Sequence, residues 1–359
     1  MTDSGTAKAK RLTSVFSISH DKDVDGLASA AIVWRYALKK GLQHDVVLTD
    51  YGSFEAVFAK LTELRDTLII VTDLGLDDTS RPSVIKALRK AIAQDCRLVW
   101  LDHHRWPEQS IRAVLSLPNR PVLKINHEFC ASEIAYKVLM PNDEISRELA
   151  VVAHDTDFNL RRIEAANALT DAVSILRFNA IDRRTDITAA LIPLLKALAE
   201  EGLAGVWDEQ RGRLKDDLLE QRVRHYRREK TKRMRKALAG HCDLEIHGRL
   251  VRIVEMPTGV TTTDMGTFLS DPANLRLGEK TLPVADLVVT VGQGGKIGFR
   301  RGRPNVRCDA AAKLFGGGGH PFAAGGDYGM YDNFQAVCDD IFTTLADNKD
   351  WVVEEESSD

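Results

Sequence analysis

The chain has 359 residues, of which 44% are hydrophobic and 28% are charged, and its formal net charge at pH 7 is -3. A chain of this length exceeds the size at which a single hydrophobic core stops growing, so the sequence predicts two domains. The small negative charge argues against a generic polyanion-binding surface, and any contact with nucleic acid must come from local patches.

Cysteine usage and hydropathy indicate the compartment. Five cysteines occur without a C-x-x-C pair, which predicts a reducing environment and no zinc ribbon. The first residues, MTDSGTAKAKR, lack the apolar core of a signal peptide, and no run approaches the roughly 18 apolar residues of a membrane span. We therefore expect a cytoplasmic protein with no membrane partner.

The first half of the chain alternates short apolar or β-branched runs with segments of helical spacing. This alternation is typical of a doubly wound, mainly parallel α/β sheet. The expected strands are residues 12–19, 45–49, 67–72, 97–101 and 121–125. The clearest expected helices are residues 27–40, 53–64, 80–94 and 132–139, and several of them follow a Ser or Asp suited to capping.

The second half begins with a helical pattern and ends in a second α/β region. From about residue 186 the spacing is helical up to the basic run QRVRHYRREKTKRMRKALAG. The strands expected after it are 244–246, 250–255 and 286–291, with a hairpin through VGQGGKIGFR and a final helix over 333–346. The sequence thus predicts a first domain over 1–185, a helical linker over 186–239 and a smaller α/β C-terminal domain over 240–350.

Polar clusters follow three of the expected strands: HDKDVDG the first, DLGLDD the third and DHHRW the fourth. Ligands of open parallel sheets bind at the carboxyl ends of the strands, so we expect these clusters to be neighbours. Asp21, Asp23 and Asp25 alternate along the chain and can converge on one point, where divalent cations would relieve their repulsion. A solvated acidic loop is the alternative for this stretch.

Three further acids and two histidines follow apolar segments. Asp73 comes directly after TLIIVT, and it either meets a partner such as a metal ion or caps the next turn. His103 offers an imidazole nitrogen to a metal, Asp102 can accept a ring proton or orient a neighbour, and His104 can meet a phosphate oxygen. A fourth cluster, VVAHDTDFN, contains Asp155.

The order of these clusters resembles the DHH phosphoesterase superfamily. The shared pattern is an Asp-x-Asp-x-Asp-Gly stretch, an isolated Asp after the next core strand, Asp-His-His, and a later Asp in a His-Asp-Thr-Asp-Phe context. The resemblance covers about the first 180 residues. It resumes at GFRRGRPNVRCDAAAKLFGGGGHPFAAGG, which looks like the Gly-Gly-Gly-His substrate-binding segment of the DHH-associated domain. RecJ-like and nanoRNase-like members are the most similar branches.

The resemblance implies a two-metal centre. Its ligands would be Asp23 on one metal, Asp25 on the other, Asp73 as the bridge, and His103 and Asp155. Many relatives have a histidine where this chain has Ser19, and in the RecJ-type spacing Asp21 takes the place of that histidine. Whether Asp21 or His20 completes the ligands of the first metal stays open. Mixed carboxylate and imidazole ligands suit two Mn²⁺ ions, with Co²⁺ or Mg²⁺ as substitutes.

The implied reaction is hydrolysis of a phosphodiester by a hydroxide that two metal ions activate, with Asp102 and His104 as catalytic residues. In the C-terminal domain the glycines would let the main chain approach an anion, to which charged side chains would add hydrogen bonds. A flexible linker is the alternative. The expected substrate-binding residues are Arg300, Gly316, Gly317, Gly318, Gly319 and His320.

We therefore expect a manganese-dependent exonuclease or nanoRNase that acts on short single-stranded RNA or DNA. A phosphodiesterase for cyclic or linear dinucleotides, such as cyclic di-AMP or pApA, is the alternative, and a non-catalytic nucleic-acid-binding subunit of replication or repair is the alternative of another class. The basic run over 221–236 is either a solvated helix, which we favour, or a nucleic-acid contact. Homo-oligomerisation is left open.

Overall fold

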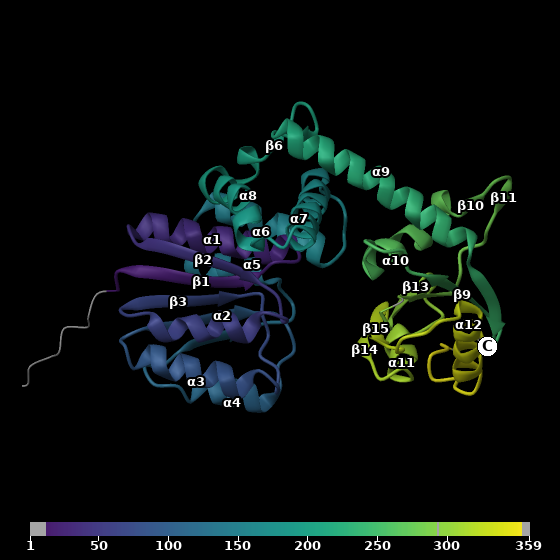
Figure 1. The fold of residues 1–359 in the computed structure, drawn as a ribbon, viewed down its shortest axis with the longest axis horizontal. Helices are drawn as coiled ribbons and strands as arrows, with labels where there is room; N and C mark the ends of the chain where they lie inside the picture. The colour runs from purple at the N-terminus through teal and green to yellow at the C-terminus, as the bar shows by residue number, and fades with distance from the viewer. Residues whose placement is uncertain (1–11, 293, 354–359) are drawn as a thin grey trace, which may run out of the picture. The chain divides into compact units, whose positions relative to one another are not determined.

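The computed structural model describes residues 12–292 and 294–353, which divide into two compact units (Figure 1). The first unit ends at Tyr226 and the second begins at Arg227, so the division falls inside helix α9 (Asp217–Ala239). Helix α8 (Ile187–Glu201) lies in the expected linker, but it packs against α1 and α7 of the first unit. Among the described helices, none combines the length and the apolar character needed to cross a membrane.

The first unit is built on a five-stranded parallel sheet of order β2-β1-β3-β4-β5, which confirms the predicted fold class. All six residues of β3 are buried, as expected for a central strand that is covered on both faces. The strand order reverses between β1 and β3, where doubly wound sheets bind their ligands. The strands are β1 (Ser14–His20), β2 (Gln43–Thr49), β3 (Thr67–Thr72), β4 (Arg97–Asp102) and β5 (Val122–Ile125).

Helices cover both faces of this sheet, and each face has its own apolar core. Helices α2, α3 and α4 pack on one face around Trp100, and α1 and α5 to α8 pack on the other (Figure 1). These helices are α1 (Val24–Lys40), α2 (Phe54–Lys60), α3 (Arg81–Ile92), α4 (Glu108–Leu115), α5 (Ala131–Leu139), α6 (Glu144–Asp157), α7 (Glu164–Asp182) and α8, with the 3-10 turn η1 (Leu61–Glu63) after α2.

A tight turn joins β1 to α1. Asp23 caps α1, because its carboxylate accepts a hydrogen bond from the Gly26 backbone N–H at 3.0 Å. Gly26 packs so closely on the end of β1 that an added Cβ would lie 2.2 Å from the carbonyl oxygen of His20. Only glycine fits there, and the turn therefore places the acidic stretch directly at the end of the strand.

The start of α6 is fixed to α1 by ion pairs. Asp143 caps α6 through the Ser146 backbone N–H at 2.9 Å and pairs with Arg35 and Lys39. Burial opposes the charge of Asp143, but the two cations prevail and hold its pKa well below its usual value. This pairing fixes the position of α6, whose last residue is Asp157.

The helical pattern expected over 186–239 is interrupted in the structure. Between α8 and α9 lie the turn η2 (Gly202–Gly205) and a short hairpin of β6 (Trp207–Asp208) and β7 (Arg213–Leu214). Gly202 follows the last residue of α8 with φ 68°, and Gly212 lies in the turn between β6 and β7 with φ 56°; both values favour glycine. These glycines are the sequence signal for the break.

The second unit is built on a six-stranded mixed sheet of order β14-β15-β13-β12-β9-β8. Only β9 and β12 are parallel, and the pairing of β12 with β13 confirms the expected hairpin, although Gln293 in its turn lies outside the described residues. The strands are β8 (Cys242–Ile246), β9 (Arg249–Glu255), β12 (Leu287–Val291), β13 (Lys296–Arg301), β14 (Gly318–His320) and β15 (Ala323–Asp327).

Helices and short elements complete the second unit. The core of one sheet face is closed by α11 and α12, and the other face packs on α10 and the C-terminal part of α9. The elements are α10 (Thr262–Ser270), the turn η3 (Pro272–Asn274), the hairpin β10 (Arg276–Leu277) and β11 (Lys280–Thr281), α11 (Cys308–Lys313) and α12 (Phe334–Ala346).

Candidate metal centre

The side chains that follow β1, β3 and β4 meet at one edge of the sheet in the first unit. Within each of three overlapping groups, the atoms that could hold a metal ion lie within 4.8 Å of one another. The groups are His20 with Asp23 and Asp73, Asp73 with His103 and His104, and Asp25 with His103 and Asp157. The first two share Asp73 and the last two share His103, so together they form one continuous cluster.

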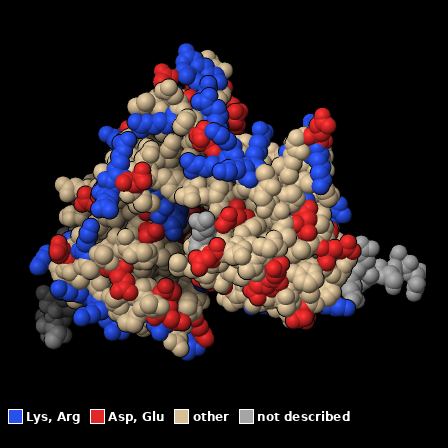
Figure 2. Space-filling model, turned by 45° about the vertical axis from the view of Figure 1, so that its right-hand side comes forward, with Lys and Arg blue, Asp and Glu red and all other residues tan. Residues whose placement is uncertain are grey.

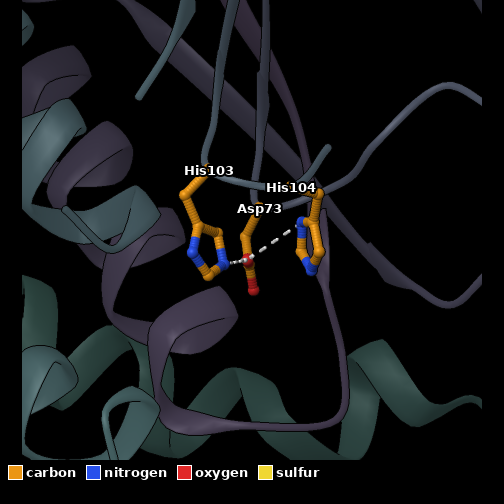
Figure 3. Close-up of side chains that lie close together, drawn as sticks. All are labelled: Asp73, His103 and His104. Carbon is orange, nitrogen blue, oxygen red and sulfur yellow. Dashed lines mark ion pairs between the residues drawn. The ribbon is translucent and has the colours of Figure 1, made fainter. Parts of the chain in front are cut away.

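Asp73 occupies the middle of this cluster. Its Oδ1 lies 3.2 Å from His103 Nε2, and its Oδ2 lies 3.4 Å from His20 Nδ1. Figure 3 shows the Asp73 carboxylate between the rings of His103 and His104. The backbone of Asp73 has φ 57°, an uncommon value for a residue other than glycine. This conformation turns the chain at the end of β3, and such strained residues gather at functional sites.

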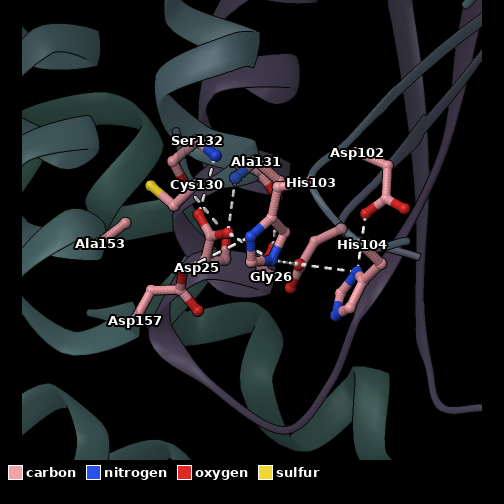
Figure 4. Close-up of polar contacts among 12 residues, drawn as sticks. Asp25, Gly26, Asp102, His103, His104, Cys130, Ala131, Ser132, Ala153 and Asp157 are labelled. Atoms are coloured by element: carbon pink, nitrogen blue, oxygen red, sulfur yellow. Dashed lines mark hydrogen bonds and ion pairs between the residues drawn. The ribbon is translucent and has the colours of Figure 1, made fainter. Parts of the chain in front are cut away.

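The carboxylate of Asp25, a residue of α1, is bound by the backbone at the start of α5. It accepts hydrogen bonds from the backbone N–H groups of Ala131 at 2.7 Å and Ser132 at 2.8 Å (Figure 4). Burial, and then the charges of Asp73 and Asp157, nevertheless raise the pKa of Asp25 well above its usual value. The carboxylates of this cluster therefore need more positive charge than the helix end supplies.

The histidines of the cluster provide that charge as protonated rings. Burial lowers the pKa of His103, but the hydrogen bond to Asp73 and the charges of Asp157 and Asp25 outweigh it and raise the pKa to about 10. His20 is affected in the same way by Asp23 and Asp73, and its pKa is also about 10. The protons on these rings therefore neutralise the acids in the same place as a bound cation would.

The donor set fits divalent metal ions. Among the described residues, both ring nitrogens of His20 and the Oδ2 atom of Asp73 are buried without a hydrogen bond of good geometry, although His20 Nδ1 lies within ion-pair distance of Asp23 and Asp73. Buried polar atoms are nearly always satisfied, so such atoms call for an explanation, and a metal site is one that fits their chemistry. Carboxylate and imidazole ligands without thiolate suit Mn²⁺ and related ions.

Asp102 positions a neighbour of the cluster. Its side chain is fully buried, and it accepts a hydrogen bond from Trp106 Nε1 at 2.6 Å and lies 2.8 Å from His104 Nδ1. Burial lowers the pKa of His104, but the hydrogen bond to Asp102 and the charges of Asp102 and Asp73 together outweigh it and raise the pKa. Of the two roles that the sequence allowed for Asp102, its contacts match the orientation of a neighbour, and that neighbour is His104 (Figure 4).

Asp21 lies in an ion pair outside the three groups. Its Oδ1 is 2.7 Å from Nε of Arg177, which also contacts Asp50 at 2.9 Å. Of the two residues that the sequence left open, the structure thus brings His20 into the cluster and pairs Asp21 with an arginine. Arg177 is 156 positions away in the sequence, and no local signal indicates this contact.

Asp155 and Asp157 also have different surroundings. Both carboxylate oxygens of Asp155 accept backbone hydrogen bonds, from Arg162 at 3.0 Å and Ile163 at 3.1 Å, which closes the loop after α6. Asp157 Oδ2 lies 3.6 Å from His103 Nδ1. Burial raises the pKa of Asp157 to about 6, and the charges of Asp73 and Asp23 add to this effect. The structure therefore brings Asp157, and not the expected Asp155, into the ligand groups.

The comparisons with known proteins agree with this site. The model of the DHH family, N-terminal domain, matches residues 15–155, which include β1 to β5 and the acids that follow them. Residues 15–155 therefore form a DHH domain. The predicted resemblance is thereby confirmed for this part of the chain, and the sequence matches no curated protein.

Solved structures show the same fold for this DHH protein. RecJ from Thermus thermophilus in complex with Mn²⁺ is 18% identical with a TM-score of 0.56, and the match covers 97% of this chain and 54% of that chain. The pGpG-specific phosphodiesterase PggH from Vibrio cholerae is 12% identical with a TM-score of 0.53, over 94% of this chain and 100% of that chain. An exopolyphosphatase-related protein from Bacteroides fragilis is 14% identical with a TM-score of 0.50, and the match covers 94% of this chain and 92% of that chain.

The metal affinity of the DHH centre is expected to rise with pH from about 6 to 10. His20 and His103 carry protons below a pKa of about 10, and a metal must displace them before it can bind a ring nitrogen. Each displaced proton strengthens apparent binding up to about tenfold for every pH unit. Calorimetric titration with Mn²⁺ at several pH values, in buffers of different ionisation enthalpy, measures both effects. An affinity that does not change with pH, with no proton released, would contradict this view of the site.

The second unit of the DHH protein contains a pocket of about 790 Å³ along its glycine-rich segment. Four of the expected substrate-binding residues line it, namely Arg300, Gly316, Gly318 and Gly319. Gly317 does not line it; this residue packs against β15, where an added Cβ would lie 2.0 Å from the carbonyl oxygen of Gly325. His320 is exposed and stacks on Phe322, with ring centroids 5.2 Å apart.

Sequence reasoning missed part of this pocket. Thr262 and Thr263 line it from the first turn of α10, and Lys296 lines it from β13. The start of a helix attracts anions through its unpaired backbone N–H groups. The run TTTD, in which Thr261 caps α10, is the sequence signal that could have located this side of the pocket.

Proposed function

We propose that this DHH phosphoesterase is a metal-dependent phosphodiesterase that hydrolyses short single-stranded RNA or DNA. The observation that carries the proposal is the cluster around Asp73, in which acids and imidazoles from the ends of β1, β3 and β4 and from α1 and α6 lie within reach of common ions. Perturbed pKa values in one cluster are typical of catalytic sites. Phosphoester hydrolysis is the chemistry of the superfamily.

The ligand groups suggest how two ions would be held. His20 and Asp23 would hold one, Asp25, His103 and Asp157 the other, and Asp73 would hold both. Four carboxylates balance the charge of two divalent cations, which removes the repulsion that raises the pKa of Asp25. Solved RecJ structures hold Mn²⁺ or Mg²⁺, and the mixed ligands here favour Mn²⁺.

The residues around the ions would supply the remaining catalytic functions. When bound, the two cations lower the pKa of water and stabilise the charge that develops on the phosphoryl oxygens. His104, oriented by Asp102, would donate a hydrogen bond from Nε2 to a phosphate oxygen or protonate the leaving group. The raised pKa of His104 favours the protonated ring, which a donor at Nε2 requires.

The pocket of the second unit would bind the anionic end of the substrate. The main chain at Gly316 and Gly318 can come close to phosphate oxygens, because a Cβ at either position would meet open space and no side chain stands in the way. Arg300 and Lys296 add positive charge to the same pocket. Its volume of about 790 Å³ lies in the range of pockets that enclose small ligands.

Linear or cyclic dinucleotides are the second candidate substrates. The likeness to the pGpG-specific phosphodiesterase covers the whole of that chain, which makes this alternative specific enough to test. A linear dinucleotide contains a single phosphodiester, which is the bond that the metal centre would hydrolyse.

The proposed function is tested by incubation of the full chain with Mn²⁺ and substrates from two to about 20 nucleotides, labelled at either end. Cyclic di-AMP, pApA and pGpG complete the series. We expect metal-dependent release of mononucleotides, fastest for the short strands or the dinucleotides. No turnover of any substrate with Mn²⁺, Co²⁺ or Mg²⁺ would contradict the proposal and favour a non-catalytic, nucleic-acid-binding subunit.

A further inference from the structure

We propose that the outward face of α9 binds the phosphate backbone of single-stranded nucleic acid, at phosphates other than the one that is hydrolysed. This inference rests on the proposed function, because it adds a second contact for the same class of substrate. The face is formed by Arg228, Thr231, Lys232 and Arg235, which together with Arg227 line a groove of about 410 Å³. All five residues belong to the second unit.

The inward face of the same helix uses its cations for internal contacts. Met234 is buried in the core beneath β12 and α10. Lys230 pairs with Asp264 of α10 at 3.4 Å, and Arg233 donates a hydrogen bond to the backbone carbonyl of Thr258 at 2.9 Å. These positive charges thus have a structural role in holding α9 on the second unit.

The outward cations have no such role. Arg228, Lys232 and Arg235 follow a spacing of four and three residues, which places them on one side of a helix, and all three are exposed. Within the described part of the chain they pair with no acid. Like charges at this spacing destabilise a helix, so the arrangement is unfavourable without a ligand.

The composition of this stretch also differs from that of an ordinary solvated helix. Residues 227–236 contain seven Lys or Arg and a single acid, Glu229, in a chain whose net charge is -3. Solvated helices usually mix the two signs of charge. Figure 2 shows Lys and Arg side chains gathered at the top of the view, where α9 lies in Figure 1. The positive charge is therefore local, as expected of a binding surface for a polyanion.

The chemistry of the face favours nucleic acid over a membrane. A helix that binds a membrane surface needs an exposed apolar face to insert between lipids. Between Arg227 and Lys236, the one large apolar residue, Met234, is buried, and the outward face is cationic and polar. From Arg228 to Arg235 the helix rises about 10 Å, which is long enough for its cations to meet successive phosphates of one strand.

The test compares the full chain with two triple variants. One variant, R228Q/K232Q/R235Q, removes the outward charges of α9. Its matched control, K86Q/R89Q/K90Q, removes the same number of exposed charges from α3 in the first unit. Binding of a fluorescein-labelled oligothymidylate of about 20 nucleotides is followed by anisotropy in EDTA, between about 50 and 200 mM salt.

We expect the α9 variant to bind the strand at least about tenfold more weakly at low salt. The slope of log K against log salt should become less steep by about 2, since each lost phosphate contact removes about 0.7. The α3 variant should bind with nearly wild-type affinity and slope. Hydrolysis of a dinucleotide with Mn²⁺ should be unchanged in both variants, because a dinucleotide has no phosphates to reach a second contact.

Three results would overturn the proposal. They are an unchanged affinity and slope in the α9 variant, an equal loss in the α3 variant, and an α9-dependent binding of phosphatidylserine vesicles without binding of the strand. Binding in EDTA does not depend on catalysis. If the wild-type chain hydrolyses nothing but binds the strand through α9, the proposed function fails and the assignment of this surface stands.

Discussion

Replacement of Asp73 with asparagine is expected to lower metal-dependent hydrolysis by about a hundredfold to a few thousandfold. The carboxylate of Asp73 is the only group that contacts both His20 and His103 within the described cluster, at 3.4 Å and 3.2 Å. Loss of one partner in a buried charged group costs about 3 to 5 kcal/mol, and each 1.4 kcal/mol corresponds to a factor of ten in rate.

The asparagine variant is chosen because the fold should tolerate it. Asparagine has the shape of aspartate and accepts the left-handed backbone that Asp73 adopts at φ 57°. The matched control is Asp78→Asn, five residues later, where the side chain is exposed. Turnover is measured with saturating Mn²⁺, and thermal unfolding confirms that both variants fold. Near-normal turnover in D73N would show that Asp73 does not hold the catalytic ions.

Replacement of Asp157 with asparagine is expected to weaken Mn²⁺ binding by at least about a hundredfold, while Asp155→Asn mainly lowers stability. Asp157 lies 3.6 Å from His103 and faces the cluster, so its loss removes a ligand. Loss of a supporting residue outside the ligand shell costs about 10-fold to 100-fold, and loss of a ligand should cost more. Asp155 instead accepts two backbone hydrogen bonds, from Arg162 and Ile163.

An asparagine at position 155 can accept only one of these hydrogen bonds and turns its amide toward the other N–H. Each unsatisfied buried group costs about 1 to 3 kcal/mol, so the unfolding midpoint should fall. Calorimetric Mn²⁺ titration and thermal unfolding of both variants separate the two roles. A metal-binding defect in D155N with normal binding in D157N would restore the ligand set that the family motif implied.

The strands that carry the site could be predicted from sequence because local patterns determine them. TLIIVT is apolar or β-branched throughout, and β3 covers the predicted residues. Asp73 can be singled out from the sequence alone, because an acid directly after a buried strand is unusual. The same reasoning located Asp102, His103 and His104 at the end of β4.

The finer choices within the site depend on tertiary contacts that the sequence does not show. Asp155 and Asp157 lie two positions apart at the end of a helix, so they point in different directions, and the packing of α6 decides which one faces His103. Asp21 and His20 are adjacent, and the distant Arg177 pairs with Asp21. A motif orders such residues along the chain but cannot choose between neighbours.

The most direct test of the two-ion centre is anomalous diffraction from crystals of the full chain grown with Mn²⁺. The arrangement predicts two anomalous peaks in the first unit, both in contact with Asp73, one beside His20 and Asp23 and the other beside Asp25, His103 and Asp157. Crystals without a peak at the carboxyl ends of β1, β3 and β4 at saturating Mn²⁺ would contradict it.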